Sequence, residues 1–165
     1  MQFEIEHTIA APRHVVEIGL GDPGFYEVFG GMPDVSAPTL LDRTEKDGVI
    51  EVRVRCAFTG ELSAAVTAVI DPSKLSWVST ITLRPSNHMA ELSLIPDHYG
   101  DRVECSAVYL FKEAADASTH EVVDGDLVVH FPLVAGKVER AILGGIKQYV
   151  AGEARALGRW ATTQT

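Results

Sequence analysis

Several features that would point to a familiar class of function are scarce in this sequence of 165 residues. Only two cysteines occur, Cys56 and Cys105, and they have neither the paired spacing of a zinc site nor the density of a disulfide framework. They are therefore expected to be buried free thiols. The six histidines show no i,i+4 pairing, so their spacing predicts no metal site.

Positive charge is also scarce, because 14 Lys and Arg face 23 Asp and Glu and leave a formal net charge of −9. Nucleic acids and anionic membrane surfaces would repel such a protein. No apolar run reaches the length of a membrane span, and the acidic start, MQFEIEHTIAAP, lacks the basic beginning of a secretory signal. These absences predict no nucleic-acid partner, no membrane insertion and a cytoplasmic location.

Apolar residues are plentiful at 46% of the chain, enough for one domain, residues 1–165, with a substantial core. The clearest pattern covers residues 134–161, where apolar side chains recur every three or four positions and basic ones fall opposite. This spacing predicts one long C-terminal helix. Near the N-terminus, residues 13–20 and 21–32 predict two short helices, with Asp22 as the cap of the second and Pro23 at its first position.

Alternation of apolar and polar residues predicts seven strands, at residues 2–10, 35–46, 49–58, 75–84, 89–96, 102–112 and 119–131. Short turns join the last six, which favours an antiparallel meander that the first strand extends by pairing with the last. Residues 60–74 mix helix-type and strand-type residues and are expected to be irregular or a short helix. The predicted fold is α+β, a curved seven-stranded antiparallel sheet wrapped around the long helix.

This order of elements resembles the START-like superfamily, which holds polyketide cyclases and pathogenesis-related ligand-binding proteins. The segment IAAPRHVVEIGLGDPGFY is similar to that family's Ala-Pro turn, helix and Asp-Pro-x-x-Tyr step. The junction HFPLVAGKVERAI resembles that of an actinobacterial subfamily of unknown function. The resemblance implies the helix-grip fold and a hydrophobic cavity between sheet and C-terminal helix, which in relatives holds lipids, polyketides or similar molecules. It brings no catalytic motif that transfers residue by residue, and it implies no cofactor.

The candidate ligand-binding residues are the inward-facing ones around this cavity: His7, Val54, Cys56, Trp77, Ile81, Tyr109, Ile142, Gly145, Ile146 and Tyr149. Tyr149 lies mid-stripe on the helix, where its phenol either bonds to a ligand or belongs to an ordinary core. Gly145 either leaves volume for a ligand or allows close contact with a residue such as Trp77. His7, on the apolar face of its strand, is either a base or a satisfied core histidine.

Glu153 falls within the same apolar stripe, where burial is costly unless the carboxyl is paired or neutral. Because it is near the end of the helix, we expect it at the cavity mouth, with a catalytic acid as the alternative.

Binding or transport of a small hydrophobic molecule is the leading function. A cyclase- or hydrolase-like enzyme using His7, Tyr109 or Glu153 comes second. A protein-interaction module comes third, because the outer strand faces are charged.

Overall fold

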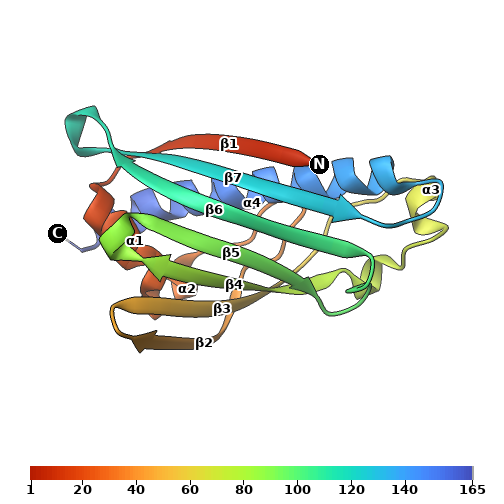
Figure 1. Ribbon diagram of the computed structural model, residues 1–165, viewed down its shortest axis with the longest axis horizontal. Coiled ribbons are helices and arrows are strands. Elements are labelled where there is room, and N and C mark those ends of the chain that lie inside the picture. Colours follow the sequence, from red (N-terminus) through yellow and green to blue (C-terminus); the bar gives the residue numbers. More distant parts are fainter. Residues whose placement is uncertain (165) are drawn as a thin grey trace.

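A seven-stranded antiparallel sheet curves around one long helix in the computed structural model, which describes residues 1–164 (Figure 1). The strands are β1 (Gln2–Ile9), β2 (Thr39–Lys46), β3 (Val49–Ala57), β4 (Ser76–Arg84), β5 (Met89–Pro96), β6 (Val103–Glu113) and β7 (Thr119–Val129). The α-helices are α1 (Arg13–Gly21), α2 (Pro23–Val28), α3 (Ala64–Thr67) and α4 (Ala135–Thr162), and the 3-10 turns are η1 (Pro72–Lys74), η2 (Pro85–Asn87) and η3 (Ala115–Ala117). The predicted α+β helix-grip fold is confirmed.

The strands follow the spatial order β1-β7-β6-β5-β4-β3-β2, so the meander and the pairing of the first strand with the last are as expected. Tight turns make the short connections possible. Between β2 and β3, both Asp47 and Gly48 have positive φ, at 54° and 76°, which suits the twist of a two-residue hairpin. The second strand begins at Thr39 rather than at Val35, because Val35 forms bridges with Met32 and Phe58 instead.

The two short helices after β1 form as predicted, because the local sequence both caps and separates them. The Asp22 side chain accepts a hydrogen bond from the backbone N–H of Gly24 at 2.7 Å, and Pro23 occupies the first helical turn. The Tyr26 hydroxyl donates to the carbonyl of Leu20 at 2.8 Å and ties α2 to α1. Both helices contact α4.

The long helix α4 differs along its length in how it is covered. Between 135 and 149 only Val138 is buried, whereas between 150 and 161 most inward residues are buried: Val150, Gly152, Glu153, Ala154, Ala156, Leu157, Trp160 and Ala161. Opposite the first half lies the segment between β3 and β4, where α3 sits beside the first turns of α4 (Figure 1). No helix within residues 1–164 is both long and apolar enough to cross a membrane.

The outer face of the sheet carries charged side chains that pair with one another across strands. Arg53 bonds to Asp42 at 2.8 Å, and Arg55 bonds to Asp97 at 2.9 Å. Exposed pairs of this kind add little to stability, but they keep this face solvated. The expectation of a polar outer face therefore agrees with the structure.

Candidate functional site

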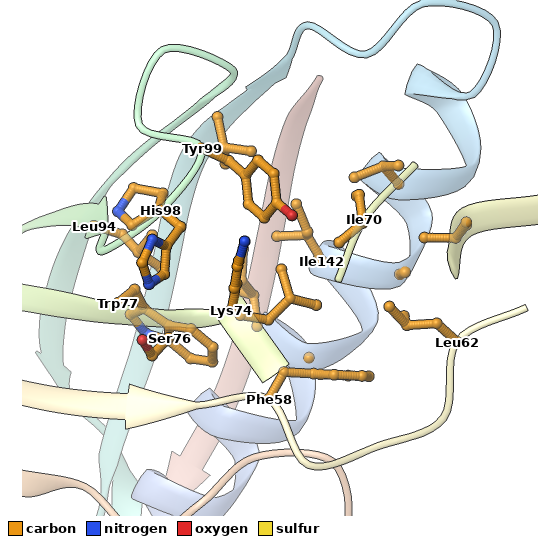
Figure 2. A pocket seen from close by; sticks show the side chains of 18 of the residues that line it. Phe58, Leu62, Ile70, Lys74, Ser76, Trp77, Leu94, His98, Tyr99 and Ile142 are labelled. Carbon is orange, nitrogen blue, oxygen red and sulfur yellow. The ribbon is translucent and has the colours of Figure 1, made fainter. Parts of the chain in front are cut away.

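An apolar cavity lies between the inner face of the sheet and the first half of α4 (Figure 2). Its empty space, counted together with the open mouth, is about 930 Å³. Helix α4 contributes one wall: Val138, Ala141, Ile142, Gly145, Ile146 and Tyr149. The segment between β3 and β4 contributes the facing wall: Phe58, Leu62, Val66, Ile70, Lys74 and Leu75.

Gly145 faces this open space rather than a close neighbour. A Cβ atom built on Gly145 would meet only Val35 Cγ2, at 3.9 Å, and one built on Gly144 would meet nothing within 4 Å. The alternative of close contact with Trp77 is therefore not what the structure shows. The missing side chain leaves volume in the wall of the cavity.

Polar side chains gather at one side of the cavity, where Figure 2 shows Lys74, His98 and Tyr99 together. The Tyr99 hydroxyl accepts a hydrogen bond from the backbone N–H of Asp71 at 3.1 Å, and its ring packs edge-on against Phe131. Hydrogen bonds from Ser73, and more weakly the charges of Lys74 and His98, lower the pKa of Asp71. These polar residues border the cavity at one side, but the surface that faces the cavity is nearly all hydrocarbon.

The structure places the predicted site residues in two regions. Five line the cavity: Trp77, Ile142, Gly145, Ile146 and Tyr149. Four are buried in the core outside this lining: Val54, Cys56, Ile81 and Tyr109. The last, His7, is half-buried on β1, and its Nε2 has no hydrogen-bond partner among the described residues. Burial, and then the charge of Arg155, lower the pKa of His7.

Sequence reasoning missed the wall supplied by residues 58–75. The sequence places Phe58 and Leu75 in strands but predicts only an irregular or short helical stretch at residues 60–74, which gives Leu62, Val66 and Ile70 no role in the cavity. A usable signal was present, because Leu62, Val66 and Ile70 recur every four residues in an otherwise mixed stretch. Such spacing is typical of a short helical segment with one apolar side.

Glu153 does not lie at the cavity mouth, so that expectation is wrong. It is fully buried at 0% exposure in the covered half of α4, because the last turns of the helix pack under α1 instead of projecting past the sheet. Glu121 on β7 is also 0% exposed. Around these carboxyls, the hydroxyls of Tyr109 and Tyr149 are buried too. We call Tyr109, Glu121, Tyr149 and Glu153 the acid cluster.

Within residues 1–164 the oxygens of the acid cluster have no partner in strict hydrogen-bond geometry, although the phenols of Tyr109 and Tyr149 lie close enough to Glu153 to bond to it. This is unusual, because buried polar atoms in proteins are nearly always paired. Burial raises the pKa of Glu153 to about 8, while the nearby phenols of Tyr109 and Tyr149 act in the opposite direction. Burial, and then the proximity of Glu153, also raise the pKa of Glu121 well above its ordinary value. Glu153 is therefore mainly neutral at pH 7 and presents an O–H donor.

Across the described part of the chain, His, Cys, Asp and Glu form no group of three that could hold a metal ion. Burial raises the pKa of both free thiols, of Cys56 to about 12 and of Cys105 to about 11, so neither is a ready nucleophile or metal ligand at neutral pH.

Comparison with known proteins assigns a family and a fold. Residues 4–161 match the family described as protein of unknown function (DUF2505). No curated protein matches this chain. Among solved structures, TTHA0849 from Thermus thermophilus is 13% identical, with a TM-score of 0.68 over 100% of this chain and 99% of its own.

Two further solved structures have the same fold and carry enzyme names. The ZhuI aromatase/cyclase from Streptomyces sp. R1128 is 22% identical, with a TM-score of 0.64 over 98% of this chain and 93% of its own. Norcoclaurine synthase from Thalictrum flavum is 15% identical, with a TM-score of 0.63 over 98% of this chain and 86% of its own. At these identities the likeness shows a shared helix-grip fold.

Proposed function

Because the chain belongs to the DUF2505 family, whose function is unknown, we propose a function from the cavity itself: binding or transport of a small hydrophobic molecule, such as a lipid or polyketide. One observation carries the proposal, namely an open cavity walled almost entirely by hydrocarbon between the sheet and α4. The space of about 930 Å³ includes open solvent at the mouth, and the cavity proper holds about 120 Å³, so the proposal is for a small ligand.

The cavity is open and is not filled by the protein's own side chains, which supports a role in ligand binding. Ile142, Ile146 and Tyr149 are all half-buried although they lie on the inward stripe of α4. Apolar side chains in this state gain free energy when a ligand removes their remaining surface from water, at about 25 cal/mol for each Å² covered. The fold is the one shared with an aromatase/cyclase and with norcoclaurine synthase, which is compatible with the proposal without adding a substrate.

A cyclase- or hydrolase-like enzyme is the second candidate, and Glu153 is the observation in its favour. A carboxyl with a pKa of about 8 can donate a proton near neutral pH. An acid–base mechanism needs two such groups within reach of a common point in the cavity. Tyr109 and Glu153 lie together, but neither is part of the cavity lining. Binding is therefore the better supported function.

The test is to fill the cavity without changing the rest of the helix. Ile146→Trp adds a large side chain to the cavity wall, whereas Lys147→Trp adds the same side chain one position further, on the exposed face of α4. We expect N-phenyl-1-naphthylamine, a neutral apolar dye, to gain fluorescence with the wild type and with Lys147→Trp. Ile146→Trp should bind it roughly tenfold more weakly or worse, because overpacking opposes the ligand.

Both variants are first checked by circular dichroism and thermal unfolding. Equal dye affinity in a folded Ile146→Trp protein would place the site elsewhere. No dye binding by the wild type would refute the proposed function at the ligand size tested. Extraction of protein purified from its own source, followed by mass spectrometry, then identifies the natural ligand.

A further inference from the structure

Two basic side chains border the apolar cavity, although the chain as a whole is acidic. Lys74 and His98 belong to the cavity lining, and no Asp or Glu of residues 1–164 does. The whole sequence, by contrast, holds 23 acidic residues and 14 Lys and Arg. The sign of charge at the cavity is therefore opposite to the net charge of the protein.

Both basic side chains lie where the cavity meets water. Lys74 and His98 are exposed, whereas the surface that faces the cavity is nearly all hydrocarbon. The stem of Lys74 therefore covers part of the wall, and its amino group reaches solvent at the rim, as long basic side chains usually do. Figure 2 shows this amino group between the His98 ring and the Tyr99 hydroxyl. We call Lys74, His98 and Tyr99 the donor rim.

The donor rim has hydrogen-bonding capacity that the rest of the described chain does not use. The side chains of Lys74 and His98 form no hydrogen bond or ion pair within residues 1–164. The Tyr99 hydroxyl accepts from the backbone N–H of Asp71 at 3.1 Å, which leaves its own proton to donate. An ammonium group, an imidazole N–H and a phenol O–H are thus present at one side of the cavity mouth.

Two acids close to the donor rim are already bonded to other groups. Asp97 accepts from the Arg55 guanidinium at 2.9 Å. Asp71 accepts from the backbone N–H of Ser73 at 3.0 Å and from the Ser73 hydroxyl at 2.6 Å. Both carboxylates attract the basic members of the rim, but neither forms an ion pair with them. The rim is therefore able to bind a further anionic group.

We propose that the cavity binds a small apolar monocarboxylic acid, such as a short-chain fatty acid, whose carboxylate is held at the mouth by Lys74 together with His98 and Tyr99. This inference rests on the proposed function, because it requires an apolar molecule in the cavity. It adds the chemical class of the polar end and the direction in which the molecule lies, with the tail against α4.

A carboxylate fits the mouth better than it fits the interior of the cavity. In the hydrocarbon interior an ionised carboxyl would lose its hydration without gaining a partner, which is costly. At the mouth it keeps part of its hydration and gains charge-assisted hydrogen bonds. A phosphate dianion fits less well, because Asp71 and Asp97 lie close to the rim and the chain carries a net charge of −9.

The experiment compares octanoate with octan-1-ol, which have chains of the same length, although only octanoate is charged at pH 7. Displacement of N-phenyl-1-naphthylamine gives the affinity of each, and the ratio of octanoate affinity to octan-1-ol affinity separates the polar end from hydrophobic burial. Lys74→Gln removes the ammonium group and should lower this ratio roughly fivefold, the upper size for an exposed ion pair. Lys74→Glu adds repulsion and should lower the ratio further. The affinity for octan-1-ol should change little in both variants.

Lys112→Gln is the matched control, because Lys112 is exposed on β6 and lies outside the cavity lining. It changes the net charge by the same amount as Lys74→Gln, so it should keep the wild-type ratio. His98→Ala removes a second donor from the rim and should lower the ratio roughly twofold. Thermal unfolding of each variant checks that the fold is intact.

The outcomes distinguish this inference from the proposed function. An unchanged ratio in both Lys74 variants would overturn the carboxylate site and leave the apolar cavity standing. An equal fall in Lys112→Gln would also overturn it, because net charge alone would then set the preference. Failure of octan-1-ol and the dye to bind the wild type would overturn both proposals.

Discussion

The two halves of α4 carry one continuous apolar stripe but have opposite surroundings. Residues 135–149 stand over an open cavity with half-exposed side chains, whereas residues 150–161 are sealed beneath β1, α1 and α2. The two halves differ in the element that packs against them. A Cβ atom on Gly19 of α1 would lie 2.8 Å from Leu157 Cδ2, so α1 rests directly on the last turns of α4. The first turns face the open cavity and the segment between β3 and β4.

The buried carboxyls lie on the sealed side of this division. A charge-bearing residue is better tolerated where water can reach it, yet Glu153 is enclosed and Lys147, on the other half, is exposed. The sealed half therefore contains a local instability that the open half lacks. A group retained at such a cost in a closed region is a stronger pointer to function than any single residue of the apolar wall.

The largest expected effect comes from removing the ionisable group of the sealed half with Glu153→Gln. The pKa of Glu153 is about 8 in the folded protein and 4.5 for an ordinary Glu, so the folded state holds its proton between these values while the unfolded state releases it. Stability should then fall as the pH rises from 4.5 to 8, by roughly 3 kcal/mol at pH 7. Above pH 8 no further loss is expected from this group.

Urea unfolding of the wild type and Glu153→Gln at pH 5.5, 7 and 8.5 measures this effect. The Gln variant should be the more stable protein at pH 8.5 and show a flatter pH dependence, with a remaining slope of the same sign from Glu121. Tyr149→Phe, which keeps both carboxyls, is the control and should keep the steep dependence. Equal pH dependence in the wild type and in Glu153→Gln would show that Glu153 is not held neutral.

A smaller effect, a difference of about 2 kcal/mol in the cost of truncating an apolar side chain, should separate the two halves. Leu157 is 1% exposed, and Leu157→Ala should cost about 3 kcal/mol of unfolding free energy, since it leaves a void in a closed region. Ile142 borders the cavity and is half-exposed, so Ile142→Ala should cost only about 1 kcal/mol. Denaturant midpoints give both values. Similar losses at the two positions would mean that the first half is as tightly packed as the second.

The fold could be predicted almost completely from the sequence, because each strand has its own alternation and each boundary its own turn chemistry. Asp22 and Pro23 correctly predict where α2 begins, and Asp47-Gly48 correctly predicts the hairpin between β2 and β3. These are local signals. A fold made of an antiparallel meander and one helix needs few others, since neighbours in sequence are neighbours in space.

The candidate site was only partly predictable, because it depends on contacts between distant segments. Periodicity identified the inward face of α4, but it could not show that α1 would cover Glu153. The expectation of an exposed helix end failed for that reason. Periodicity likewise could not predict that Glu121, 32 positions away on β7, lies close to Glu153. Tyr109 was found as an inward residue, yet its place in the acid cluster follows from the packing of β6 under the sealed half.

The smallest expected effect uses the glycines of α4. Replacing Gly by Ala inside a helix gains about 1 kcal/mol where space allows. Gly145 has that space, since its new Cβ would meet only Val35 at 3.9 Å, and Gly145→Ala should stabilise the protein by nearly this amount. Gly152 does not, because its Cβ would lie 2.7 Å from Met32 Cγ and 2.8 Å from Met32 Sδ.

Gly152→Ala should therefore gain nothing or lose about 1 kcal/mol, since Met32 must move and the helical gain is offset by the lost packing. Gly144→Ala, with no atom within 4 Å of its Cβ, is the control and should match Gly145→Ala in thermal unfolding. If Gly152→Ala stabilises the protein, then Met32 can move at little cost and the packing of residues 150–161 is looser than these distances indicate. The difference between the halves would then lie in their polar groups rather than in their packing.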